Sequence, residues 1–197
     1  MIDLYYDKDI VKEGTSSLYE VCSEVKLPLS KDEIECLDGL LEYLIVSENE
    51  ELCQKYNIRP GVGIAAPQVG VNKRMFAINC NDFLSKDNKK YFYTFINPKI
   101  IERSKSEIYL PNGEGCLSVV RDTEGLVTPR SKKITIKALS YDYSTKKIKN
   151  ITMALEGYPA IVFQHEYDHL DGILYTSKMY KPEDLKNAEP LFEIDEE

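Results

Sequence analysis

The stretch Gln164-His165-Glu166-Tyr167-Asp168-His169 decides how this sequence is interpreted. Residues four apart on a helix lie on one face, one turn from each other, so both imidazoles can point at a single cation. Glu166 follows the first imidazole and can reach a water on that cation. The chain contains only two histidines, and both stand in this stretch. The pattern therefore predicts a metal site rather than two structural histidines.

The residues around this stretch predict the helix that carries it. Pro159 suits the first turn of a helix and Gly172 suits its end, so we expect a helix from near Pro159 to near Gly172. Another helix is predicted over residues 30–47, where Ser30 and Glu33 form a capping-box pattern ahead of an apolar stripe. That stripe indicates packing on a sheet, without a role in chemistry.

Short β-rich runs broken by turn residues occupy the region between the two predicted helices. We predict strands at residues 74–80, 91–97, 99–103, 134–140 and 148–155, a polar loop at 81–90 and a turn at 141–145. In the acidic tail, Leu191, Phe192 and Ile194 could form one last short strand. The expected fold class is α+β, with mixed β-strands around a central metal-binding helix, in a single domain over residues 1–197.

A hydrolytic metal site needs a third protein ligand besides two imidazoles, and an open position for water. A third histidine six residues after His169 is excluded, because Tyr175 stands there. Glu189, about twenty residues downstream, would complete a small zinc metalloprotease site of the HExxH type. Pro182 and Pro190, however, keep Glu189 out of any long supporting helix.

An upstream cysteine is the remaining candidate for the third ligand. Cys116 lies in Glu114-Gly115-Cys116-Leu117-Ser118. Taken alone, a cysteine among small and apolar residues is usually a buried core thiol. Residues 61–68 (GVGIAAPQ) form a second segment of small residues, in which glycines permit close approach of a ligand and Gln68 can donate a hydrogen bond. By itself that segment equally fits a glycine-rich turn into a packed element.

Together, the three segments resemble the peptide deformylases. That family is marked by Gly-x-Gly-x-Ala-Ala-x-Gln, Glu-Gly-Cys-Leu-Ser and Gln-His-Glu-x-Asp-His-Leu, which stand here in the same order at residues 61–68, 114–118 and 164–170. The similarity extends from about residue 10 to residue 180. Pro67, expected inserted loops at 46–60 and 81–90, and Arg121 with Asp122 look like the longer type 2 form. Residues 14–19 depart from the family's usual pattern near the substrate entrance.

The resemblance implies a ligand set and a mechanism. Cys116, His165 and His169 would bind one divalent ion, with water in the fourth position. Glu166 would take a proton from that water and later return it to the departing amine. The oxyanion would be stabilised by the metal, the Gln68 side chain and the backbone N–H of Leu117. A non-catalytic relative that kept only the fold would be favoured if Glu166 or Gln68 were missing, and both are present.

The resemblance also implies where the substrate binds. The peptide would lie as an extended strand beside the edge at residues 61–63, and its methionine side chain would enter an apolar pocket. The residues expected at this site are Val62, Gly63, Gly115, Tyr158, Ile161 and Val162. Ile161 and Val162 equally fit an ordinary core. Glu114 and Arg130 stand where family members place an ion pair that supports the cysteine segment, although Arg130 taken alone fits a surface charge.

The resemblance also implies a cofactor and a substrate, and the composition indicates which other partners to exclude. Family members commonly use Fe²⁺, with zinc, nickel or cobalt as substitutes, and a thiolate ligand suits all four metals. The substrates would be N-formylmethionyl nascent peptides, with transient association with the ribosome as a further expectation. The formal net charge of −8 argues against sequence-specific nucleic-acid binding. The sequence lacks an apolar run of roughly 20 residues, and its five cysteines are scattered, so we expect the cytoplasm of a bacterium and no membrane partner.

Overall fold

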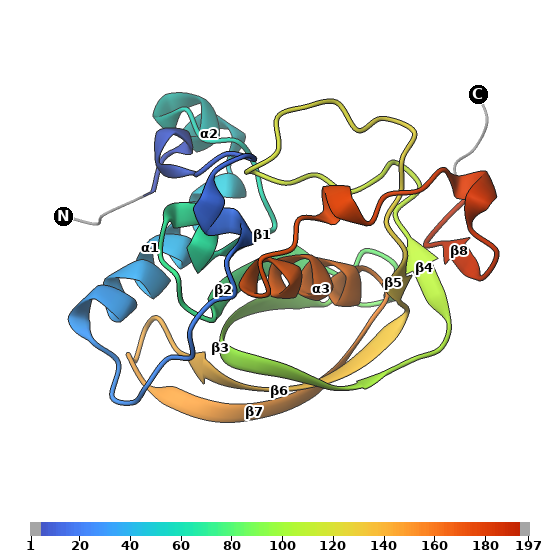
Figure 1. Cartoon of the computed structure of the whole chain (residues 1–197). Coiled ribbons are helices and arrows are strands. Elements are labelled where there is room, and N and C mark those ends of the chain that lie inside the picture. The colour runs from blue at the N-terminus through green and yellow to red at the C-terminus, as the bar shows by residue number, and fades with distance from the viewer. Residues whose placement is uncertain (1–4, 194–197) are drawn as a thin grey trace.

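The computed structural model describes residues 5–193. Its central element is helix α3 (Tyr158–Leu170), which lies over the sheet (Figure 1). Gly157 precedes α3 with a φ of 66°, a conformation that glycine adopts without strain, and Pro159 occupies the first turn. Asp171 caps the other end, and Gly172 follows with a φ of 69°. The helix predicted between Pro159 and Gly172 is thus confirmed.

A five-stranded antiparallel sheet supports α3. Its strands are β1 (Gly63–Ala65), β2 (Met75–Asn81), β3 (Lys90–Arg103), β6 (Lys133–Tyr141) and β7 (Ile148–Glu156), in the order β1-β2-β3-β6-β7. The strands predicted at 74–80, 134–140 and 148–155 are confirmed to within about one residue at each end. Strand β1, which was not predicted, forms one edge of the sheet because, in the described part of the chain, only β2 pairs with it.

The predictions at 91–97 and 99–103 require a correction, because the two segments form the single strand β3. The register between β3 and β6 shifts between Ile96 and Lys99, on either side of Pro98. Proline has no N–H for the ladder, so the strand passes this point through an irregularity in pairing rather than ending there.

A smaller three-stranded sheet lies at one end of α3, in the order β5-β4-β8 (Figure 1). It consists of β4 (Glu107–Tyr109), β5 (Arg130–Ser131) and β8 (Ala188–Pro190). The predicted last strand was therefore placed too late in the chain. Leu191 still donates its N–H to the Tyr109 carbonyl, but Phe192 packs against Phe83, and Ile194 lies outside the described residues.

Helix α1 (Lys31–Ser47) confirms the helix predicted over residues 30–47, with the Ser30–Glu33 capping box present. The segment 46–60, expected to be a loop, instead contains helix α2 (Glu50–Tyr56), whose first turn is capped by the Asn49 side chain. The remaining helices are short 3₁₀ turns at Asp7–Asp9, Ser16–Tyr19, Ala66–Val69, Tyr175–Ser177 and Pro182–Asp184.

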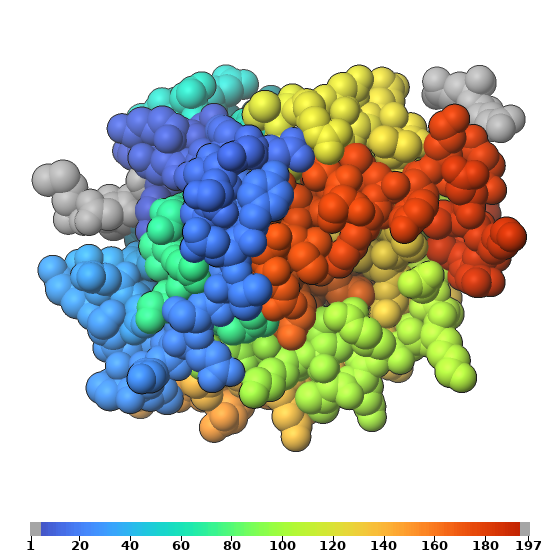
Figure 2. Space-filling view, in the orientation of Figure 1, coloured from blue at the N-terminus to red at the C-terminus, as the bar shows by residue number. Residues whose placement is uncertain are grey.

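The buried core has two parts, one on each side of β2. Helix α1 packs on one part through Leu37, Leu40 and Leu44, and α3 packs on the other through Phe163, whose ring lies 4.9 Å from that of Phe95. Figure 2 shows the N-terminal segment in contact with both the loop that follows β4 and the segment that follows α3. Between residues 5 and 193, no helix combines the length and the apolar character needed to span a membrane.

Candidate active site

Three predicted ligands come together where the segment after β4 passes over α3. The ligand atoms of Cys116, His165 and His169 all lie within 4.8 Å of one another, and Cys116 Sγ is 3.4 Å from His169 Nε2. Helix α3 supplies both imidazoles from one face. One sulfur and two nitrogen donors suit a divalent transition metal and leave a coordination position for water. The residues present therefore fit a metal ion.

Glu114 orients the first of these imidazoles. Its Oε2 lies 2.7 Å from His165 Nδ1, which leaves Nε2 of the ring for a metal. Arg130 donates two hydrogen bonds to the same carboxylate, at 2.8 and 2.9 Å. Although burial opposes ionisation, Arg130 and His165 lower the pKa of Glu114 to about 2, so this carboxylate is ionised at neutral pH. The expected Glu114–Arg130 ion pair is present, and the surface position considered for Arg130 is wrong because its side chain is 4% exposed.

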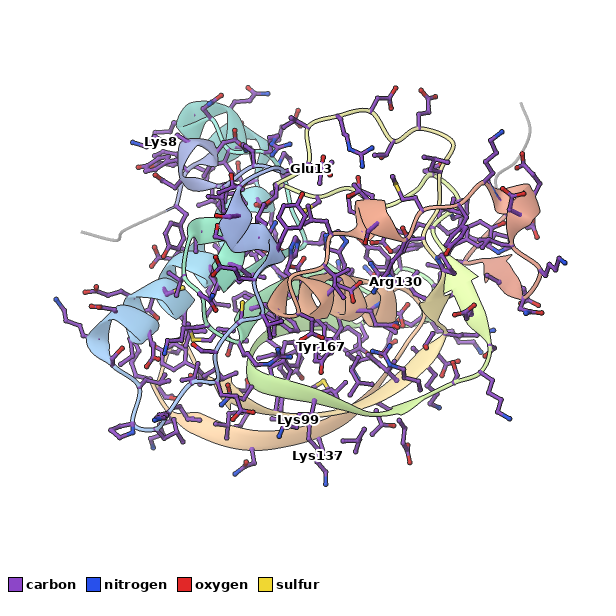
Figure 3. The ribbon with its side chains drawn as sticks, viewed as in Figure 1. Lys8, Glu13, Lys99, Arg130, Lys137 and Tyr167 are labelled. Atoms are coloured by element: carbon purple, nitrogen blue, oxygen red, sulfur yellow. The ribbon has the colours of Figure 1, made fainter. Side chains whose placement is uncertain are left out.

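Two further charged residues, Asp168 and the partly exposed Lys178, extend the network around Arg130, which Figure 3 labels beside α3. Arg130 also donates to the Asp168 carboxylate, and Lys178 Nζ binds the other oxygen of that carboxylate at 2.9 Å. The network holds the segment that contains Cys116 against the helix that contains both histidines. Asp168 stands inside the motif, but its role was not predicted from the sequence, because its buried partner Arg130 lies 38 positions away in the chain.

The Glu166 carboxyl lies in the same pocket as the candidate metal ligands. It is buried, its Oε2 has no hydrogen-bond partner among the described residues, and it lines the same pocket as Cys116 and His165. Burial raises the pKa of Glu166 to about 7, which suits a group that accepts and returns a proton near neutral pH. Its carboxylate occupies the space next to Gly63, where a Cβ would lie 2.4 Å from Oε1.

The two expected oxyanion donors lie beside the ligand cluster. Gln68 Oε1 accepts the Ala65 N–H at 2.8 Å, which directs the Gln68 amide nitrogen to Cys116 Sγ at 3.4 Å and Ser118 Oγ at 3.2 Å. Leu117 follows Cys116 and lines the pocket with Gln68. The Gln68 side-chain amide and the residue that follows Cys116 therefore line the same pocket as Cys116 and His165.

A pocket of about 840 Å³ opens in front of these groups. Every residue expected to bind substrate lines it, namely Val62, Gly63, Gly115, Tyr158, Ile161 and Val162. Ile161 and Val162 are also buried, so they serve both the core and the pocket wall. Gly63 of β1 lines the pocket, and among residues 5–193 that strand pairs with β2 alone, so an extended peptide could add there as a further strand.

Sequence reasoning missed Tyr175 as a site residue. Its ring lies 5.5 Å from that of His165, and its hydroxyl is 3.2 Å from Thr123 Oγ1 in the loop above the pocket. Tyr175 occupies the position at which a third histidine was sought. An aromatic residue at a ligand-like spacing was the one available signal.

The structure places Glu189 away from the two histidines, so the metalloprotease alternative lacks a third ligand. Glu189 lies in β8, opposite Ile108 of β4, and its side chain is exposed. The ligand-like cluster found in the described part of the chain contains Cys116 and both histidines, without Glu189.

Comparisons with known proteins agree with this geometry. The polypeptide deformylase family model matches residues 7–184. A peptide deformylase of Halalkalibacterium halodurans is 45% identical over 172 residues, covering 87% of this chain and 90% of that relative. A Met-Ala-Ser-bound class I type b peptide deformylase from Acinetobacter baumannii has a TM-score of 0.66 and 26% identity, over 90% of this chain and 99% of that one. A probable peptide deformylase from Synechococcus phage S-SSM7 has a TM-score of 0.62 and 32% identity, over 86% and 97%.

The family model covers most of the chain, and it includes all three segments that build the pocket. The expected α+β fold, the family and its activity are thereby confirmed. The chain belongs to the peptide deformylase family, the metalloenzymes that remove the N-formyl group from newly made peptides.

Proposed function

We propose that Cys116, His165 and His169 bind one divalent ion, natively Fe²⁺, and that the chain uses it to deformylate N-formylmethionyl nascent peptides. The observation that carries this proposal is the convergence of one thiol and two imidazoles beside the buried Glu166 carboxyl in a single pocket. Zinc, nickel and cobalt suit the same ligands and would act as substitutes. Iron is preferred because of the family resemblance.

The protein side chains supply the proton transfers. When bound, the ion supplies Lewis-acid polarisation and makes a water easier to deprotonate. Glu166 accepts the proton of the water that attacks the formyl carbon. As the formyl oxygen becomes negative, the Gln68 amide and the Leu117 N–H donate hydrogen bonds to it. Glu166 then returns its proton to the amine nitrogen as the C–N bond breaks, so formate and a free N-terminus leave.

The substrate would bind along the free edge of β1. Main-chain hydrogen bonds to the segment around Val62 and Gly63 would tolerate varied sequences, since they read no side chain. Tyr158, Ile161 and Val162 would enclose the methionine side chain. The Met-Ala-Ser-bound structure of the Acinetobacter baumannii relative supports a peptide that begins with methionine.

We also infer that residues 1–197 act as one catalytic domain in the cytoplasm of a bacterium, with transient association with the ribosome. The resemblance to the type 2 form supports this setting. Helix α2 and the loop between β2 and β3 fall in the two segments that the comparison with type 2 members marked as insertions.

The first test is anaerobic release of formate from formyl-Met-Ala-Ser by the iron-loaded protein. Wild type should release formate and leave unformylated Met-Ala-Ser intact. Glu166→Gln keeps the shape of the side chain but cannot accept the proton, so its kcat should fall at least about a hundredfold. The metal content of this variant should stay at that of wild type.

Two outcomes would contradict the proposal. Cleavage of internal peptide bonds without formate release would assign the site to a protease. Unchanged formate release by a Glu166→Gln variant of confirmed identity would remove Glu166 from the mechanism.

A further inference from the structure

The backbone carbonyl of Leu117 receives two cationic donors. Arg59 Nη2 donates to it from the segment between α2 and β1, and Lys12 Nζ donates at 3.3 Å from the N-terminal segment. Charged donors make stronger hydrogen bonds than neutral ones. The carbonyl of Leu117, a residue of the pocket wall, is therefore held by two charged side chains.

Asp7 aligns these two cations. Its Oδ1 accepts from Arg59 Nε at 2.8 Å and from Lys12 Nζ at 3.2 Å. The backbone of Arg59 is held as well, because the hydroxyl of the fully buried Tyr43 donates to the Arg59 carbonyl at 2.9 Å. We call Asp7, Lys12 and Arg59 the Leu117 clamp.

The same N-terminal segment also contacts both segments that carry the expected oxyanion donors. The Val11 N–H donates to the Gln68 carbonyl at 2.8 Å, and the Glu13 N–H donates to the Ser118 carbonyl at 2.7 Å. Figure 3 shows Glu13 where the N-terminal segment meets the loop over the pocket. Residues 11–13 therefore set the separation between the Gln68 segment and the Leu117 segment.

Hydrogen bonds hold the peptide groups on both sides of Leu117. The peptide that contains this N–H is held through the Cys116 carbonyl, which accepts the Val119 N–H at 3.1 Å. The next peptide is held through the Leu117 carbonyl by the clamp. With both flanking peptides held, the φ and ψ angles of Leu117 are determined, and so is the direction in which its N–H points.

We propose that Arg59 and Lys12 are positioning residues for deformylation, which hold the Leu117 N–H toward the oxygen of the formyl group. This inference rests on the proposed function, since it needs the Leu117 N–H to act as an oxyanion donor. A displaced donor stabilises the transition state less while leaving the methionine pocket intact. The clamp therefore contributes to kcat rather than to KM.

The test compares Arg59→Met and Arg59→Lys with wild type in anaerobic formate release from formyl-Met-Ala-Ser. Methionine keeps an apolar stem but removes the Nε and Nη2 donors of Arg59. The kcat should therefore fall about 10- to 100-fold, with KM within about twofold of wild type. Lysine keeps one charged donor and should recover part of the loss. Lys12→Met removes the second donor alone and should lower kcat in the same direction by a smaller factor.

Lys146→Met provides the matched control. The Lys146–Asp38 ion pair is 51% and 26% exposed, close to the 40% and 29% of Arg59 and Asp7, and it joins the β6–β7 hairpin to α1, with neither residue lining the pocket. This variant should keep the wild-type kcat. Iron content and thermal midpoint are measured for every variant, and the clamp variants should retain one ion per chain.

Three results for Arg59→Met would overturn the inference. A kcat of Arg59→Met equal to that of Lys146→Met would show that the clamp does not position the donor. A rise in KM alone would make Arg59 a substrate contact, and a loss that parallels lost iron or lost folded protein would make its role purely structural. If wild type itself releases no formate, the proposed function fails before the clamp is tested.

Discussion

Gly63 and Glu166 show how a single missing side chain shapes the site. Strand β1 approaches α3 so closely that only a residue without a Cβ leaves room for the Glu166 carboxylate. Gly63→Ala should displace that carboxylate and lower kcat by about tenfold or more, because general-base geometry is lost. Formate release measures the effect, and metal content should stay unchanged. A Gly63→Ala enzyme with the wild-type kcat would show that the carboxylate can act from another position.

Glu114 contributes both to metal binding and to the free energy of unfolding. Glu114→Gln removes one charge of a buried pair, leaving Arg130 with Asp168 as its remaining anionic partner, and should cost about 3 kcal/mol of the free energy of unfolding. Metal affinity should also fall about 10- to 100-fold, because His165 loses an anionic partner. Urea unfolding and metal titration measure the two effects.

The matched control is Glu156→Gln, which breaks an exposed pair with Lys133 and should cost less than about 1 kcal/mol. Equal losses in the two variants would contradict the account of the buried network.

For single residues, the sequence predicted the side chains expected to take part in the reaction but missed those that position them. The spacing of His165 and His169 is local, so one helix suffices to foresee it. Cys116 needed the family resemblance, because nothing local distinguishes a ligand thiol from a core thiol. The contacts of Asp168 and Arg59 join segments far apart in the chain, and no local pattern encodes them.

Among the elements, α1, α3 and the long strands followed from apolar periodicity and caps. Three failures have physical causes. Pro98 indicated a strand end, but β3 continues through an irregular pairing. The segment 46–60 was assigned as a loop although Asn49 caps a short helix within it. Strands of two or three residues, such as β1 and β5, exist only because of their partners and carry no periodic signal.

The stabilisation that the N-terminal segment provides depends on pH through Asp7. Burial opposes ionisation of Asp7, but hydrogen bonds from Arg59 and Lys12 outweigh it and hold its pKa below the usual 3.8. Because the folded pKa is the lower one, the stabilisation is fully present above about pH 3.8 and is lost as pH falls through the folded value. Asp7→Asn should therefore unfold about 0.5 kcal/mol more easily at pH 7, and this difference should shrink as the pH falls below 3.8.

Urea unfolding of the chelator-treated protein measures this difference, since metal loss at low pH then plays no part. Asp87→Asn, in the exposed loop between β2 and β3, is the control and should unfold like wild type at pH 7. A difference for Asp7→Asn that grows as the pH falls would contradict the account.

At the scale of the whole molecule, the metal site joins segments that are distant in sequence. Cys116 comes from the segment between β4 and β5, whereas His165 and His169 come from α3, so an ion would cross-link the two. An ion that binds only the folded chain adds to the free energy of unfolding in proportion to the logarithm of its concentration. The thermal midpoint should therefore fall after chelation and recover on reloading.

The most direct test of the central claim is an anaerobic titration of metal-free protein with Fe²⁺, with formate release from formyl-Met-Ala-Ser as the readout. We expect no formate release without metal, a linear rise to one ion per chain, and no comparable rise for Cys116→Ala. Full activity of the metal-free protein, or a Cys116→Ala titration identical to that of wild type, would contradict that claim.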